Sequence, residues 1–324
     1  DPKIHKLASS IFCKNIQSNV DKTINSYPRH KKIRLGYFSA DFHNHATMHL
    51  MAELFEKHNK NLFQIYAFSF GPNKQDIWRE RAISSFYKFI DVSSKTDQEI
   101  TQLAIDMEID IAIDLKGYTQ DSRPRIFKNK CAPLQVNYLG YPGTLGSGYM
   151  DYIIADETII PKDSQKYYSE KIIYMPDTYQ VNQTNRLISQ KLISKKDLGI
   201  KNSSFVFCSF NNSYKISPDV FESWMRILNA VEDSILWLLV GNKHVAKNLA
   251  SEAAKLGVNK SRLVFAEYVP IDEHLNRIKC ADLFIDTNPY NAHTTCSDAL
   301  RMGLPVLTKL GNSFASRVSA SLLK

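Results

Sequence analysis

The sequence predicts an α/β protein built from two doubly wound, Rossmann-like lobes. Short apolar runs, which are typical of buried parallel strands, alternate with helical patterns along most of the 324 residues. The alternation occurs twice, on either side of a polar stretch at residues 176–203. A chain of this length can form two domains with separate cores. We expect a helical leader and linker at residues 1–30, an N-terminal lobe at 31–185 and a C-terminal lobe at 186–324.

The leader is expected to be helical because Leu7, Ile11, Ile16 and Val20 recur at roughly helical spacing, until Tyr27-Pro28 breaks the pattern. The first lobe then opens with a strand and its exit loop at residues 32–42. Further strands are expected at residues 63–68, 89–92, 109–115, 134–138, 152–155 and 172–174, and helices at residues 49–57, 77–86 and 97–107.

The second lobe repeats this order. Ser217 precedes Pro218, which is the pattern of a capped helix start. Strands are expected at residues 205–208, 235–239, 263–265, 283–285 and from 306, and helices from residue 218, at 243–256, at 271–279 and from 294 to Gly303.

The segment from 281 to 308 indicates an anion site. Its apolar strand is followed by a loop and by Thr294 and Thr295, which open a helix. The free amide groups at a helix start favour an anion, and loops at the carboxyl ends of parallel strands are where open α/β sheets bind ligands. His293 and both hydroxyls add donors, so a phosphate or diphosphate is the expected ligand. Thr295 and Asp298 have the spacing of a capping box, and an ordinary capped helix gives the same pattern.

Composition and the absence of certain motifs argue against several classes of protein. The net charge is +8, but residues 1–35 carry +6 of it, so the rest is nearly neutral and a nucleic-acid partner is not expected. No apolar run approaches the 18 or so residues of a membrane span. Five scattered cysteines suggest neither disulfides nor a metal site, and a cytoplasmic location is expected. Dehydrogenase, P-loop and serine-hydrolase motifs are missing, and no acidic pair lies on a loop suited to a metal.

Several strand-end segments resemble a known family. SADFHNHATMHL is similar to SSDFGNHPTSHL of the O-GlcNAc transferase and SPINDLY glycosyltransferases, and LGYPGT, FCSFNNSYKI and HTTCSDALRMGLPVLT match further blocks. The resemblance covers about residues 30 to 324 and is greatest to bacterial-type members. It implies the two-lobed GT-B architecture and an inverting, metal-independent enzyme that moves N-acetylglucosamine from UDP-GlcNAc to Ser/Thr hydroxyls of proteins. No cofactor is expected besides this donor substrate.

The resemblance also implies roles for single residues. Lys215 would contact the donor diphosphate and stabilise the leaving group, and His45 would act near the sugar or acceptor, either as a base or by orienting groups. Gly143 and Thr144 would line the cleft. The remaining implied donor-binding residues are Asn212, Tyr214, His274, Arg277, His293, Thr294, Thr295 and Asp298, the last on the ribose.

Some features depart from the family. Position 271 is Ile where animal members have Lys, and position 212 is Asn where they have Gln, so the base preference is open. A protein O-fucosyltransferase using GDP-fucose, or a non-catalytic nucleotide-sugar-binding scaffold, would share the motifs. Members continue past the block that ends at Lys324, so the second lobe is expected to be incomplete. Members also carry an N-terminal helical-repeat array that binds the polypeptide acceptor.

Overall fold

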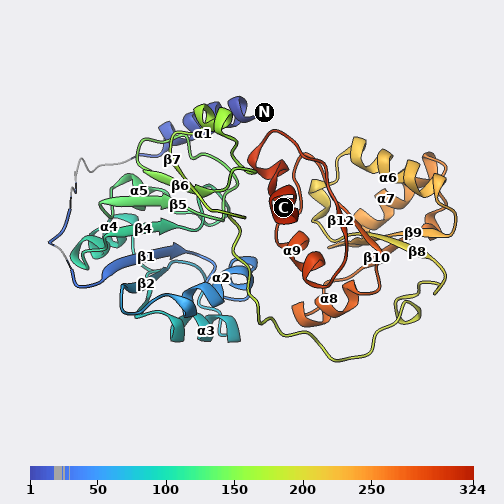
Figure 1. The fold of residues 1–324 in the computed structure, drawn as a ribbon, viewed down its shortest axis with the longest axis horizontal. Coiled ribbons are helices and arrows are strands. Elements are labelled where there is room, and N and C mark those ends of the chain that lie inside the picture. The colour runs from blue at the N-terminus through green and yellow to red at the C-terminus, as the bar shows by residue number, and fades with distance from the viewer. Residues whose placement is uncertain (18–23, 25, 29) are drawn as a thin grey trace. The chain divides into compact units, whose positions relative to one another are not determined.

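The computed structural model describes residues 1–17, 24, 26–28 and 30–324, which form two compact units at residues 1–184 and 185–323 (Figure 1). The helix α1, Pro2–Asn15, precedes the first unit's sheet. Its Leu7 and Ile11 point outward and are more than half exposed, whereas Ile16 is buried. The predicted continuation to Val20 lies outside the described residues.

The first unit contains one parallel sheet with the strand order β3-β2-β1-β4-β5-β6-β7. Its strands are β1 Ile33–Ser39, β2 Phe63–Ser69, β3 Lys88–Asp91, β4 Ile111–Asp114, β5 Leu134–Asn137, β6 Tyr152–Ala155 and β7 Lys171–Tyr174. Its further helices are α2 Ala46–Lys57, α3 Ile77–Ser85, α4 Asp97–Asp106 and α5 Arg125–Lys128. The strand order reverses between β1 and β4, so the ligand-binding switch point of this sheet lies there.

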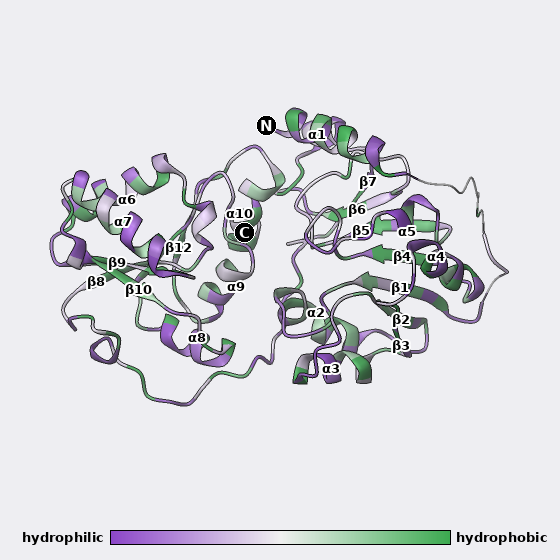
Figure 2. Cartoon of the chain, turned by 180° about the vertical axis from the view of Figure 1, so that it is seen from behind, coloured by the Kyte–Doolittle hydropathy of each residue, from purple (hydrophilic) through white to green (hydrophobic). Residues whose placement is uncertain are grey.

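Helices cover both faces of this sheet. Successive residues of a strand point to opposite faces, so each strand supplies apolar side chains to the core on both sides. Phe38 of β1 stacks on Phe68 and meets Phe127 of α5. Its neighbour Tyr37 contacts Phe55 of α2 on the other face. Figure 2 shows the strands of this sheet coloured mostly as hydrophobic, in agreement with a core on each side.

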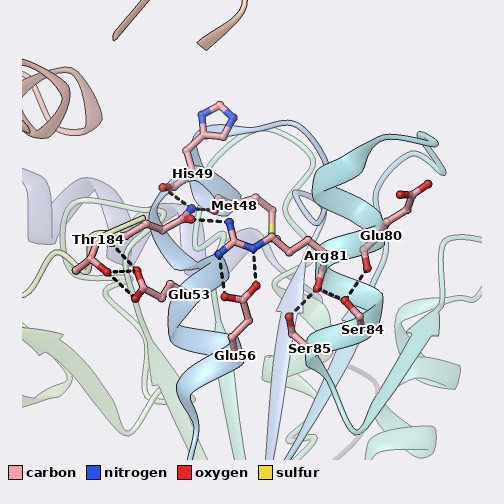
Figure 3. A network of polar contacts seen from close by, with 10 residues as sticks. Met48, His49, Glu53, Glu56, Glu80, Arg81, Ser84, Ser85 and Thr184 are labelled. Atoms are coloured by element: carbon pink, nitrogen blue, oxygen red, sulfur yellow. Dashed lines mark hydrogen bonds and ion pairs between the residues drawn. The ribbon is translucent and has the colours of Figure 1, made fainter. Parts of the chain in front are cut away.

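A polar network ties the end of the first unit to α2 (Figure 3). The Arg81 guanidinium donates to Glu56 and, over 2.6 Å, to Gln183 Oε1. Gln183 Nε2 in turn donates to the Met48 carbonyl over 2.7 Å. The Thr184 hydroxyl donates to a Glu53 oxygen at 2.7 Å. The last residues of this unit are therefore fixed on the helix that begins after His45.

The second unit contains a parallel sheet with the order β10-β9-β8-β11-β12, whose switch point lies between β8 and β11. Its strands are β8 Phe205–Ser209, β9 Ser234–Leu239, β10 Leu263–Ala266, β11 Leu283–Ile285 and β12 Val306–Leu307. Its helices are α6 Pro218–Ala230, α7 Lys243–Lys255, α8 Ile271–Ile278, α9 Thr294–Arg301 and α10 Val318–Leu323.

The core of this unit also has two sides. Apolar residues of α8 and α9 pack with Phe210 and Trp237 on one side of the sheet. Residues of α6 and α7 pack with Phe207 and Leu236 on the other. The loops after β8 and β11 thus start from strands that are fixed on both faces.

Candidate functional site

A buried hydrogen-bond network joins the loops that follow β8 and β11 at the switch point of the second unit. Asp286, which comes directly after β11, accepts hydrogen bonds from the backbone amides of Thr287 and Ala292, each at 2.7 Å. Its other oxygen accepts from the Thr308 hydroxyl at 2.6 Å. Asn211, two residues after β8, donates to Asp286 at 3.1 Å and to the Thr287 hydroxyl at 2.8 Å. The network holds the loop before α9 in one shape.

Lys215 lies on the loop that follows β8, and its side chain reaches the loop before α9. Its Nζ donates to the Asn291 carbonyl at 2.9 Å and lies 4.0 Å from the centre of the Tyr290 ring. Burial lowers its pKa to about 8, and Asp286 partly opposes the shift. No carboxylate is within ion-pair distance of this ammonium in the described part of the chain. The half-buried cation is therefore available to an anion at the carboxyl ends of the strands.

The start of α9 lies beside Lys215. The His293 ring stacks on Tyr290 with 5.0 Å between ring centres, and burial together with Lys215 lowers the pKa of His293 to about 3. The imidazole is neutral at physiological pH. The Thr295 hydroxyl donates to Asn211 Oδ1 at 2.6 Å. Thr294 is the first residue of the helix and is half-buried.

The predicted capping box is wrong. The helix begins at Thr294, so its N-cap is His293, which makes no side-chain cap bond. The Thr295 hydroxyl donates its hydrogen bond to Asn211, and the Asp298 carboxylate accepts one from Arg186. Because the His293 side chain does not cap the helix, the first amide groups of α9 keep their capacity to bind an anion.

Asp298 is buried, and burial raises its pKa while the Arg186 guanidinium opposes the shift. His274 and Arg277 lie on α8 and are also buried. Arg277 Nε donates to His274 Nδ1 at 3.1 Å, so the neutral His274 ring carries its proton on Nε2. Burial, Arg277 and Arg186 together lower the pKa of His274 to about 3. Phe210 contacts both residues, with its ring 5.0 Å from His274.

Asn212 and Tyr214 differ from the other predicted donor-site residues because both are exposed, Tyr214 to 75%. Asn212 Oδ1 accepts a hydrogen bond from the Tyr268 hydroxyl at 3.2 Å. These side chains form the outer part of the predicted donor site, next to Lys215.

His45 lies at the switch point of the first unit, as the N-cap of α2. Its Nδ1 accepts the Thr47 amide at 3.2 Å and lies 3.6 Å from the Asp41 carboxylate. Burial is the main cause that lowers the pKa of His45; Asp41 opposes it and Lys116 adds to it. With Nδ1 used as an acceptor, the neutral ring carries its proton on the outward Nε2. His45 is thus placed to donate a hydrogen bond.

A buried ion pair lies under His45. Lys116 follows β4, and its Nζ is 2.7 Å from Asp41 Oδ2. Both side chains are less than a tenth exposed. Lys116 thus holds the same carboxylate oxygen that lies nearest His45 Nδ1. The arrangement supports a fixed, neutral His45.

Gly143 and Thr144 are both buried, and their place in the lining of a cleft stays a prediction. A Cβ on Gly143 would lie 1.8 Å from the His5 ring of α1, so a larger residue there would displace that ring. The Thr144 hydroxyl donates to Glu170 at 2.6 Å. The leader helix packs over this loop, a long-range contact that no local pattern reveals, and the two residues shape the loop from within.

Four residues of these networks were not singled out from the sequence. All come one or two residues after a strand, a position that could have drawn attention to them. They are Asn211 and Asp286 in the second unit, and Asp41 and Lys116 in the first.

The described residues contain neither a membrane-spanning helix nor a cluster of metal ligands. None of their helices is long and apolar enough to cross a membrane. No group of three or more His, Cys, Asp or Glu side chains among them is arranged to hold a metal ion.

Comparisons with known proteins agree with this arrangement. The probable UDP-N-acetylglucosamine–peptide N-acetylglucosaminyltransferase SEC of Arabidopsis thaliana is 36% identical over 297 residues, covering 90% of this chain and 30% of that protein. The probable UDP-N-acetylglucosamine–peptide N-acetylglucosaminyltransferase SPINDLY of Petunia hybrida is 26% identical over 307 residues, covering 93% of this chain and 33% of that protein. The chain therefore spans about a third of the length of these relatives.

A solved structure of a mutant O-GlcNAc transferase from Thermobaculum terrenum superposes with a TM-score of 0.91 at 26% identity, covering 100% of this chain and 62% of that one. This similarity confirms the predicted GT-B class with its two parallel-sheet lobes. The family model for glycosyl transferase family 41 matches residues 10–196 and 187–324. The chain belongs to glycosyl transferase family 41.

Proposed function

We propose that this chain is the catalytic part of an inverting glycosyltransferase that moves N-acetylglucosamine from UDP-GlcNAc to Ser/Thr hydroxyls of proteins. The names of its relatives, which give UDP-N-acetylglucosamine as donor and a peptide as acceptor, support this assignment. The observation that carries the proposal is Lys215, a half-buried cation beside the uncapped start of α9.

The donor diphosphate binds where these two features meet. Cleavage of the sugar–phosphate bond leaves a charged UDP, and Lys215 together with the α9 amides offsets that charge. Both are fixed before the substrate arrives, because Asn211 and Asp286 hold the two loops. A preorganised charge stabiliser needs no reorganisation during the reaction.

The acceptor oxygen attacks the anomeric carbon and loses its proton to solvent, while the sugar–diphosphate bond breaks and its electron pair leaves with UDP. We assign His45 to this acceptor side. Its Nε2 proton can orient a hydroxyl by donating a hydrogen bond, since Nδ1 is engaged by Thr47. The buried pair of Asp41 and Lys116 keeps the ring in this orientation.

A panel of nucleotide sugars tests the proposal. Nucleotide release and transfer to Ser/Thr peptides are measured with UDP-GlcNAc, other UDP-sugars and GDP-fucose. We expect transfer from UDP-GlcNAc. Transfer from GDP-fucose alone would instead identify a protein O-fucosyltransferase, and binding without turnover would identify a scaffold.

We also propose that turnover needs no divalent metal ion, because Lys215 and the helix start already supply positive potential at the diphosphate. The expected initial rate after exhaustive EDTA treatment is within about twofold of the untreated rate, since no charge stabiliser has been removed. A rate that EDTA abolishes and Mg²⁺ or Mn²⁺ restores would contradict this.

A further inference from the structure

Arg186 lies in the polar segment that the sequence indicated as a linker, but its side chain is only 4% exposed. Its Nη1 donates to Asp298 Oδ1. The segment that carries it is itself attached to α8. The Ser189 amide donates to the Asp272 carbonyl at 3.2 Å, and Asn276 Nδ2 donates to the Lys191 carbonyl. Arg186 is thus held in a fixed position within the second unit.

The other end of this guanidinium has no partner. Arg186 Nη2 is buried and makes no hydrogen bond to any residue that the structure describes. A buried, charged donor without an acceptor is unfavourable, so such a group is usually explained by a ligand or water. The neighbouring side chains cannot supply the acceptor that it lacks. Arg277 is cationic, and the Nδ1 of His274 already accepts from Arg277.

Arg186 and Asp298 together can bind the two neighbouring hydroxyl groups of a diol. Asp298 accepts hydrogen bonds and Arg186 donates them, whereas a hydroxyl group does both. A hydroxyl that donates to Asp298 can therefore accept from Arg186 Nη2 at the same time. Asp298 lies four residues after Thr294, which is about 6 Å along a helix. A ribose whose diphosphate is bound at the helix start extends over such a distance.

We propose that Arg186, together with Asp298, binds the ribose hydroxyls of the donor nucleotide. This inference rests on the proposed function, since it presumes a nucleoside diphosphate at Lys215 and α9. It adds a binding residue from a segment that local patterns mark as a linker. The competing explanation is that the ion pair only attaches the segment to α9.

Calorimetric titrations with UDP, 2′-deoxy-UDP and 3′-deoxy-UDP distinguish ribose binding by Arg186 from a purely structural ion pair. Arg186→Met keeps the length of the side chain but removes all its donors. We expect it to weaken UDP binding about tenfold, the size of one hydrogen bond to a charged group. We expect at least one deoxy analogue to bind this variant as it binds the wild type, within about twofold, because that analogue lacks the hydroxyl that Arg186 contacts.

Two further variants complete the experiment. Arg226→Met replaces an exposed arginine of α6 and should leave all three affinities unchanged. Arg186→Lys retains the cation for Asp298 without the second donor, so it gives the same comparison if Arg186→Met does not fold. An equal loss of affinity for UDP and both deoxy analogues, or no loss at all, would overturn the inference while leaving the proposed function intact.

Titrations of the wild type distinguish a failure of the proposed function from a failure of the role proposed for Arg186. If it binds GDP and not UDP, the titrations are made with GDP and its deoxy analogues, and only the choice of donor is wrong. If it binds neither diphosphate, both the proposed function and the role of Arg186 are wrong.

Discussion

Replacing Lys215 with alanine is expected to lower kcat by roughly 10²–10³, the loss seen when one preorganised charge stabiliser is removed. Lys215 is the cation beside the α9 start, where it contacts the Tyr290 ring and the Asn291 carbonyl. UDP binding should also weaken, because the diphosphate is charged before the reaction. Initial rates and calorimetric UDP titrations measure the two effects.

The lowered pKa of Lys215 predicts that UDP affinity depends on pH. With a pKa of about 8 in the free protein, Lys215 is mostly charged at pH 7 and loses its proton above pH 8. A bound diphosphate stabilises the charged form, so UDP affinity should fall as the pH rises past 8. Lys215→Ala should show no such fall. Lys243→Ala, at an exposed position of α7, serves as the control and should retain the wild-type profile. Wild-type turnover in Lys215→Ala would contradict the assignment.

Much of the fold was predictable because the strand pattern is local. The apolar run at 283–285 is the strand β11, and Ser217 caps α6 through the Val220 amide as its position before Pro218 predicted. The start of α2 was placed too late, since the prediction began at residue 49 and the helix begins at Ala46. Its N-cap is His45, and histidine is not among the residues that signal a helix start. The four-residue helix α5 is too short to show a period.

The site was less predictable because its parts meet over long distances in the sequence. Motifs at strand ends drew attention to Lys215 and the threonines of α9. They did not show that Asn211 and Asp286, 75 residues apart, bond to each other. The polar composition around Arg186 indicated a linker, and only the folded chain shows that this side chain is buried on Asp298. Residues that act through tertiary contacts leave no local periodicity.

Replacing His45 should lower kcat without weakening the binding of UDP. Replacing it with alanine also removes the cap of α2, which costs about 1 kcal/mol of stability. Asparagine is the better test because it is a favourable N-cap residue and can still accept the Thr47 amide. We expect His45→Asn to keep the wild-type melting temperature, and His45→Ala to lower it. Both variants lose the Nε2 donor.

Both variants are therefore expected to lower kcat by roughly 10²-fold, within the range for a group that acts on a reacting hydroxyl. UDP affinity should stay within about threefold of wild type, because an interaction made mainly in the transition state is lost from kcat and not from ground-state binding. Since burial lowers the pKa of His45, the ring stays neutral near pH 7, and turnover should not fall between pH 7.5 and its ordinary pKa of 6.5. His49→Ala, one turn further along α2, is the matched control and should retain both rate and affinity. Near-normal turnover in His45→Asn, or a loss of UDP binding as large as that of Lys215→Ala, would show that His45 does not serve the acceptor side.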